Sequence, residues 1–215
     1  AYAVGVASRN LENPPKEDWV KVKRIFRYLK GTARLSIVYR RNFKQGVIET
    51  YSDADHAGDT TTGRSTTGVV CLYAGGAVSW LSQRQPSVSI STTEAEIVAA
   101  SEASRELVWL KRLLSGIVKL QAKPELHVDN EAAIRLSQNP EFHRRTKHIS
   151  TRHFFARELV GNKEVDIKKI ATEFQLADVF TKPLAKPRLK MIREELGMVP
   201  EDEEDRKTSA NEGKC

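Results

Sequence analysis

Four acidic residues stand where an apolar stretch ends or where a helix begins. They are Asp53 in TYSDAD, Glu96 in TTEAEIVAA, Asp129 in LHVDNE and Asp178 in QLADVF. Carboxylates that converge on one place repel each other unless a cation lies between them, and hard divalent cations prefer oxygen ligands. If the fold brings these four acids together, they predict a divalent metal site.

The chemistry that such a site supports is metal-assisted hydrolysis of a phosphate ester. Mg²⁺ usually binds through few carboxylates and completes its coordination with water and with phosphate oxygens of the substrate. Two such ions about 4 Å apart can activate a water and stabilise the leaving oxygen in phosphodiester cleavage. Taken singly, each acid is better explained as a helix cap, a partner of the helix dipole or a solvated strand end. The prediction therefore depends on the four acids together.

The apolar periodicity predicts the elements that must position the first two acids. Alternation with β-branched residues predicts a strand at 47–54, and two apolar runs around the Gly-Gly pair at 75–76 predict a hairpin of two more strands. A long helix follows: Ser91 and Glu94 form a capping-box pattern at its start, and Gly116 ends it. Asp53 thus stands near the end of the first strand, and Glu96 stands near the start of the helix.

The second half of the chain alternates strands and helices. A short strand ends at Asp129, and Asn130 can cap the helix after it. The remaining predicted elements are a basic helix at 146–160, a strand at 164–172, a helix that stops near Pro183 and a last helix at 187–196. The order predicts an α/β fold with a mixed five-stranded sheet, three antiparallel strands and then two parallel ones, flanked by helices.

The two ends of the chain differ from its body. Residues 1–42 contain PPKEDWVKVKRIFRYLKGT, whose apolar residues recur at spacings of three and four and predict an amphipathic helix ended by Gly31. Residues 43–197 are predicted to form one domain, and the acidic, polar residues 198–215 a disordered tail. The sequence starts without Met, so we expect a piece of a longer protein.

The composition fits a basic globular protein. The chain has 215 residues, 40% hydrophobic, with a net charge of +7, and the stretch from Pro200 carries six acidic but only three basic residues. The body is therefore more basic than the whole, which favours a polyanionic partner, with nucleic acid first. No apolar run is long enough to span a membrane. Two cysteines, Cys71 and Cys215, predict no disulfide framework and a reducing compartment.

Six motifs in one order resemble the ribonuclease H segment of the Pol polyprotein of copia-type LTR retrotransposons. They are YSDADHAGD, GRSTTG, SWLSQRQPSVSISTTEAEIVAASEASRELVWL, LHVDNEAAI, KHISTRHFFARE and LADVFTKPL, and they extend from about Phe43 to Leu196. The preceding DWVKVKRIFRYLKGTARLSIVY resembles the end of the reverse transcriptase region.

The resemblance implies a ribonuclease H-like fold and an endonuclease that hydrolyses the RNA strand of RNA–DNA hybrids during reverse transcription. It also implies two Mg²⁺ ions, with Mn²⁺ as a substitute, held by the family's four carboxylates. These fall on Asp53, Glu96, Asp129 and Asp178, the acids selected above. Asp55 is the alternative to Asp53, and Glu94 the alternative to Glu96. Glu94 ranks second because two residues along a helix point in different directions. The third acid of the first motif, Asp59, lies beyond Gly58 and is predicted to be in a loop.

The resemblance also implies partners: an RNA–DNA hybrid and the upstream reverse transcriptase region of the same polyprotein, with no membrane. The residues assigned to contacts with the hybrid are Arg144, Arg145, Lys147, Arg152 and, near the RNA 2′-OH, Ser52. A solvated helix face explains the basic stretch almost as well. The expected location is the cytoplasm, including virus-like particles, with access to the nucleus. The alternative function is a catalytically weak hybrid-binding or connection module of a Pol polyprotein, or a host-adopted element with a protein partner.

Overall fold

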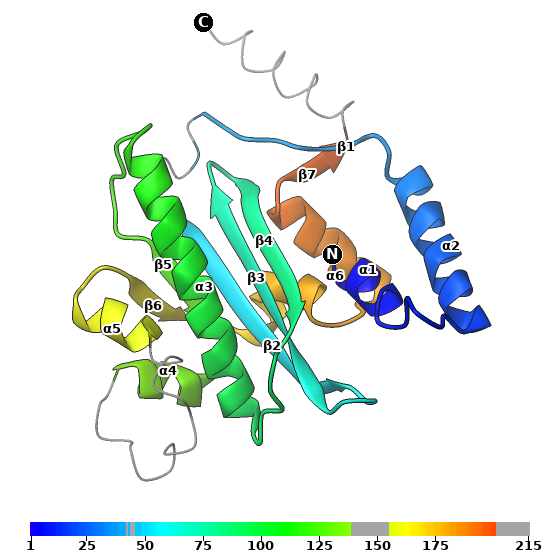
Figure 1. The fold of residues 1–215 in the computed structure, drawn as a ribbon. Coiled ribbons are helices and arrows are strands. Elements are labelled where there is room, and N and C mark those ends of the chain that lie inside the picture. The colour runs from blue at the N-terminus through cyan, green and yellow to red at the C-terminus, as the bar shows by residue number, and fades with distance from the viewer. Residues whose placement is uncertain (42, 44–45, 139–154, 201–215) are drawn as a thin grey trace, which may run out of the picture.

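A mixed five-stranded sheet forms the centre of the computed structural model, which describes residues 1–41, 43, 46–138 and 155–200 (Figure 1). The strands are β2 (Glu49–Asp59), β3 (Arg64–Tyr73), β4 (Gly76–Arg84), β5 (Glu125–Val128) and β6 (Asp166–Lys169). Their order across the sheet is β4-β3-β2-β5-β6. The first three are antiparallel, and β5 and β6 run parallel to β2. The predicted fold class is confirmed.

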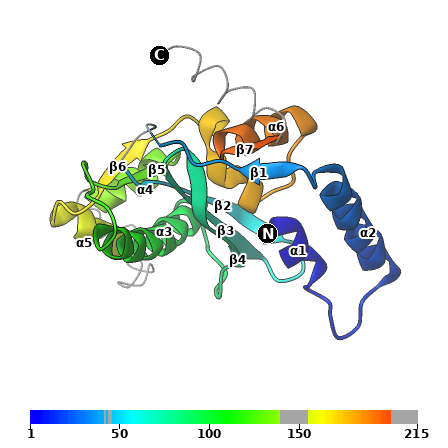
Figure 2. The same ribbon diagram turned by 90° about the horizontal axis from the view of Figure 1, so that it is seen from above.

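Helical segments cover both faces of this sheet. The long helix α3 (Thr92–Ser115) packs on one face, together with α4 (Glu131–Gln138) and α5 (Phe155–Gly161). The short 3₁₀ helix η4 (Leu176–Phe180) packs against β2 and β3, and the helix α6 (Lys186–Glu195) contacts η4. Figure 2 shows α3 and α6 on opposite sides of the strands. The sheet is therefore the middle of three layers.

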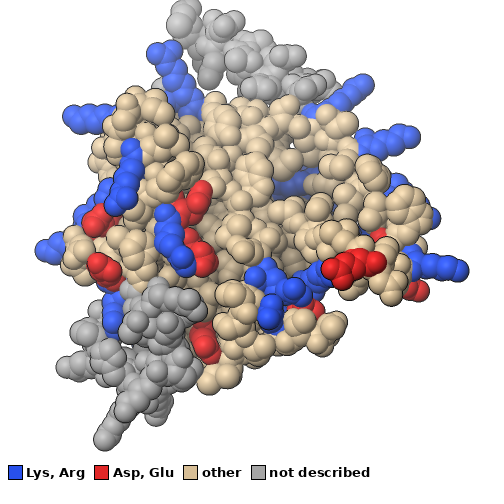
Figure 3. Space-filling view, viewed as in Figure 1, with Lys and Arg blue, Asp and Glu red and all other residues tan. Residues whose placement is uncertain are grey.

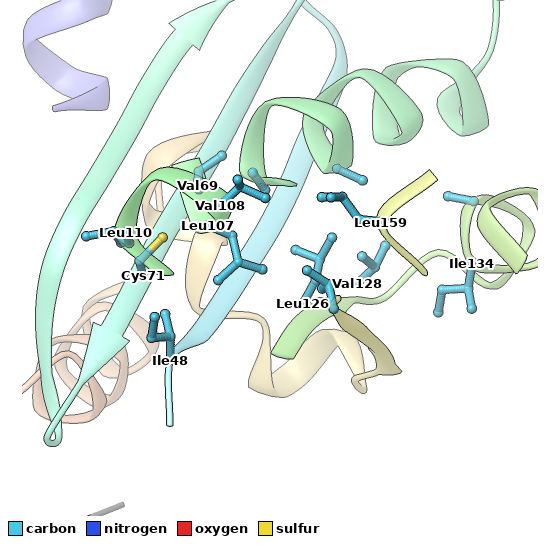
Figure 4. Packing of buried hydrophobic residues seen from close by; sticks show 14 of the residues in the cluster. Ile48, Val69, Cys71, Leu107, Val108, Leu110, Leu126, Val128, Ile134 and Leu159 are labelled. Carbon is cyan, nitrogen blue, oxygen red and sulfur yellow. The ribbon is translucent and has the colours of Figure 1, made fainter. Parts of the chain in front are cut away.

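The larger core lies between α3 and the sheet (Figure 4). Strand β3 is buried along nearly its whole length, which explains why its second half, residues 69–72, is apolar on both faces rather than alternating. Leu107 of α3, Leu126 of β5 and Val69 of β3 are fully buried in this core. Burial of one such side chain contributes roughly 1.5–3 kcal/mol. This core fixes α3, and with it Glu96, against the strands.

The smaller core lies on the opposite face and depends on a glycine in β3. Gly68 pairs with Asp53 of β2. A Cβ atom at Gly68 would lie 2.6 Å from Thr181 Cγ2 and 2.8 Å from the carbonyl oxygen of Ala177. The backbone of the η4 segment approaches the sheet this closely because no side chain stands between them.

Gly68→Ala is expected to lower the melting temperature. Overpacking at a close contact typically costs about 1–3 kcal/mol, and each kcal/mol shifts Tm by about 2–4 °C in a protein of this size. Thermal unfolding followed by circular dichroism measures the change. Gly31→Ala is the matched control, since a Cβ there would meet nothing within 4 Å. Equal melting temperatures for the two variants would contradict the role given to Gly68.

The stretch EFQLADVFTKPL, predicted as one helix, instead forms two short 3₁₀ helices, η3 (Thr172–Phe174) and η4. Gln175 between them has extended backbone and a fully buried side chain. Its Nε2 donates to the carbonyl of Ser52 at 2.9 Å. The pairing of β2 with β5 ends at Tyr51, so Gln175 replaces a strand as the partner of the next carbonyl. That tertiary bond outweighs the local helical pattern.

The two ends of the described chain meet. The predicted helix is present as α2 (Lys16–Gly31), preceded by a short unpredicted helix, α1 (Tyr2–Ala7). Strand β1 (Leu35–Ile37) pairs antiparallel with β7 (Met198–Pro200) in a separate two-stranded sheet. Residues 198–200, assigned to a disordered tail, therefore form a strand, because their backbone finds a partner far away in sequence.

Several predictions concern other parts of the chain. The rest of the tail, 201–215, and the basic stretch before Phe155 lie outside the described residues. The hairpin turn is centred on Ala74 and Gly75, both with positive φ, one position before the predicted pair. In the ranges that the structure covers, no helix combines the length and apolar character that crossing a membrane requires.

Candidate metal centre

The fold brings three of the predicted acids together at one end of the sheet. Parallel pairing aligns Tyr51 of β2 with His127 of β5. Two residues further along, Asp53 and Asp129 therefore stand at the same level on adjacent strands. The third acid, Glu96, comes from the first turns of α3. One carboxylate oxygen from each of the three lies within 4.8 Å of the others.

The start of α3 places Glu94 and Glu96 in different surroundings. The side chain of Ser91 accepts a hydrogen bond from the backbone N–H of Glu94 at 3.1 Å, as the capping-box pattern predicted. The Glu94 carboxylate in turn accepts from the backbone N–H of Ile90 at 2.8 Å. Glu94 is thus used in the cap, whereas Glu96 is buried among the converging acids.

The fourth acid, Asp178, approaches Asp53 from η4 on the opposite face. Lys182 lies between them: its Nζ is 2.8 Å from Asp178 Oδ1 and 3.8 Å from Asp53 Oδ2. The hydroxyl of Thr181 donates to Asp53 Oδ2. Neither Thr181 nor Lys182 was among the site residues predicted from the sequence. A lysine four residues after a buried acid, in LADVFTKPL, was the available signal.

The protonation equilibria of the site reflect crowded negative charge. Burial raises the pKa of Glu96 to about 9, and the charges of Asp53 and Asp129 act in the same direction. Burial also raises the pKa of Asp53 to about 6, opposed by the hydrogen bond from Thr181 and the charge of Lys182. The positive charges and hydrogen-bond donors of the protein therefore do not fully offset the burial and mutual repulsion of the ionised Asp53 and Glu96 carboxylates.

The donor set fits a divalent cation. The Glu96 Oε2 atom is buried without a hydrogen-bond partner among the described residues. A buried acceptor without a hydrogen-bond donor destabilises the folded state, and the Glu96 carboxylate also lies next to those of Asp53 and Asp129. An ion that prefers oxygen ligands would satisfy it and reduce the repulsion at once. Asp53, Glu96 and Asp129 are the residues that could hold such an ion.

A second group of potential ligands lies at the other end of the same two strands. Oxygen and nitrogen atoms of Glu49, Glu125 and His127 also lie within 4.8 Å of one another. There, however, the Lys168 ammonium is 2.5 Å from Glu125. All three of these residues are only partly buried, whereas Asp53 and Glu96 are buried, so the group that holds Asp53 is the better candidate.

The remaining acids of TYSDADHAGD have other roles. Asp55 Oδ1 accepts a hydrogen bond from the backbone N–H of Thr66, so this acid joins two strands. Asp59 was predicted to lie in a loop, but it ends β2 and is buried, 2.6 Å from Arg84 Nη1. That hydrogen bond lowers the pKa of Asp59 to about 2. The cause of the difference is an irregularity between Asp55 and Asp59, which includes a positive φ at Ala57.

Of the residues predicted to contact nucleic acid, only Ser52 lies in the described part of the chain. Ser52 is fully buried in β2, so its side chain cannot reach a nucleic acid, which corrects that assignment. The basic residues Arg144, Arg145, Lys147 and Arg152 lie outside the described ranges. On the face seen in Figure 3, Lys and Arg side chains are spread around the periphery and interspersed with acids.

The chain is similar in sequence to known proteins. No protein-family model matches it. It is 41% identical over 198 residues to the Retrovirus-related Pol polyprotein from transposon TNT 1-94 of Nicotiana tabacum, a match that covers 92% of this chain. It is 34% identical over 200 residues to the Pol polyprotein from transposon RE2 of Arabidopsis thaliana, covering 93%. The chain is a homologue of retrotransposon Pol polyproteins. This Pol homologue spans 15% and 14% of the lengths of those two relatives.

Solved structures of two RNase H proteins match part of the chain. LC11-RNase H1, isolated from compost, matches 64% of the Pol homologue and 94% of its own chain, with a TM-score of 0.46 and 17% identity. The N-terminal RNase H domain of rv2228c from Mycobacterium tuberculosis matches 69% of the Pol homologue and 96% of its own chain, with a TM-score of 0.44 and 11% identity.

Proposed function

We propose that this chain is a ribonuclease H that hydrolyses the RNA strand of RNA–DNA hybrids with two Mg²⁺ ions during retrotransposon reverse transcription. The observation that carries the proposal is the convergence of Asp53, Glu96 and Asp129, with Asp178 beside Asp53. The homology to Pol polyproteins supports this function. The resemblance of the six sequence motifs to the ribonuclease H segment implies that the substrate is an RNA–DNA hybrid.

The four acids divide into two ligand sets that share Asp53. Asp53, Glu96 and Asp129 would hold one ion, and Asp53 with Asp178 would hold the other. When bound, the ions would favour ionisation of the attacking water and stabilise the leaving 3′ oxygen. Hydrolysis would then leave a 3′-OH on one RNA fragment and a 5′-phosphate on the other.

Residues around the acids position them for this task. The Thr181 hydroxyl bonds to Asp53 Oδ2 and orients the carboxylate that both ligand sets share. Gln175 holds the backbone of Ser52, the residue before Asp53, through a bond of 2.9 Å. Such outer contacts limit the movement of the ligands, which metal sites depend on.

The test is cleavage of an end-labelled RNA paired with DNA by the purified chain in MgCl₂. We expect fragments with 5′-phosphates from the hybrid, and none from the same RNA as a single strand or in an RNA duplex. EDTA should stop the reaction. Equal cutting of single-stranded RNA would contradict hybrid specificity. Tight hybrid binding without cutting would replace this proposal with the binding-module alternative.

A further inference from the structure

The two proposed ligand sets are compensated very differently in the protein itself. Glu96 Oε2 in one set and Asp178 Oδ1 in the other both lack a hydrogen-bond partner among the described residues. In those residues, however, no lysine or arginine forms an ion pair with Glu96 or Asp129. In the other set, Asp178 has two cations beside it, Lys182 Nζ at 2.8 Å and Arg188 Nη2 at 3.5 Å. One half of the site is therefore open to a cation, while the other half already contains positive charge.

The two cations beside Asp178 are not equally fixed. The same Nη2 atom of Arg188 donates to the carbonyls of Thr172 at 2.9 Å and Gln175 at 3.1 Å, which ties the guanidinium to the backbone around η3. No comparable bond to a backbone carbonyl is found for Lys182 in the described ranges. Its side chain is 41% exposed, against 6% for Asp178. The ammonium can thus move into solvent without breaking a hydrogen bond to the backbone, although its ion pair with Asp178 is lost.

We propose that the Lys182 ammonium is a placeholder cation in the Asp53–Asp178 half of the site. It offsets the repulsion between these two acids in the metal-free protein, and a divalent ion can bind there only by displacing it. The reason is steric and electrostatic, because Mg²⁺ requires oxygen ligands at about 2.0–2.1 Å and an ammonium at the same oxygens would repel it.

The consequence is ordered metal binding. The first divalent ion would bind at Asp53, Glu96 and Asp129, where Lys182 approaches only the shared ligand Asp53, at 3.8 Å. The second would bind more weakly, because part of its binding free energy is used to displace Lys182. This inference rests on the proposed metal site but does not depend on which nucleic acid the protein cuts.

The experiment is a calorimetric titration of the metal-free protein with Mn²⁺, without nucleic acid, on the parent and on Lys182→Gln. We expect the weaker binding event to tighten about 10-fold in the variant, a size typical of changes next to metal ligands, and the stronger event to stay unchanged. The melting temperature of Lys182→Gln in EDTA should fall, because the two acids lose their counter-charge.

Two further variants separate the effect of the Lys182 charge from a general effect of losing a lysine. Lys190→Gln is the matched control: its ammonium is exposed and lies 3.7 Å from Glu194, so both binding events should equal those of the parent. Lys182→Arg keeps the charge and should keep the weak second event. A second event in Lys182→Gln that is unchanged or weaker would overturn the placeholder role. If the parent bound no Mn²⁺ at all, the metal site of the proposed function would itself be wrong, whereas failure to cut a hybrid would leave this titration unaffected.

Discussion

Asp129→Asn is expected to lower the rate of hybrid cleavage by more than about 100-fold, since even outer contacts of metal ligands typically contribute 10–100-fold. The Asp129 carboxylate lies within 4.8 Å of those of Asp53 and Glu96. Asparagine keeps the shape of the side chain but removes one of three negative charges that would hold the first ion. Single-turnover cleavage of a labelled hybrid at fixed MgCl₂ measures the loss.

Asp166→Asn is the matched control for this substitution. Asp166 begins β6, the neighbouring strand, and its exposed carboxylate is 3.5 Å from the Lys123 ammonium. The Asp166→Asn substitution makes the same chemical change away from the site, so the cleavage rate of this variant should equal that of the parent. If Asp129→Asn cut the hybrid as fast as Asp166→Asn, the assignment of Asp129 to the metal site would be wrong.

The metal-free protein is expected to lose stability as the pH rises from about 5 to 9. Burial raises the pKa of Glu96 to about 9 from its ordinary value of 4.5, so the folded state binds this proton more tightly than the unfolded state. That contribution is complete below pH 4.5 and is lost as the pH rises through 9. Asp53, with a pKa raised to about 6, adds to the loss at the acidic end of this window.

Thermal unfolding in EDTA across this pH range measures the effect. One pKa unit corresponds to about 1.4 kcal/mol, and one kcal/mol to about 2–4 °C in Tm, so a fall of about 5 °C or more is expected. MgCl₂ should reverse most of it at pH 8 by supplying the missing positive charge. Glu96→Gln should flatten the pH profile and abolish the stabilisation by MgCl₂. Glu102→Gln, on the exposed side of α3, should behave like the parent, and a parent profile as flat as that of Glu96→Gln would exclude the explanation.

The position of the acids could be predicted because it follows from the order of elements. Asp53 follows the end of the parallel pairing of β2 with β5, Asp129 directly follows β5, and Glu96 lies in the first turns of the helix that packs across them. Apolar periodicity locates strands and helices, and parallel pairing aligns their ends. The resemblance to Pol polyproteins selected the same residues independently.

The charges that balance these acids could not be predicted in the same way. Lys182 was visible in the motif, but its place between Asp53 and Asp178 depends on how η4 folds back over Gly68. Asp59 looked like a loop residue after Gly58, yet an irregular strand end brings it to Arg84. Both outcomes depend on contacts between segments far apart in sequence, which local patterns do not encode.

The pairing of β1 with β7 has a consequence for synthesis on the ribosome. In the described part of the chain, β1 has no strand partner other than β7, and β7 follows β1 far later in the sequence. At about 5–20 residues per second, roughly 10–30 s separate the appearance of the two strands. During that interval the edge of β1 stays unpaired, and closing so long a loop is slow. The central sheet, whose last strand ends at Lys169, can therefore form before β1 and β7 pair with each other.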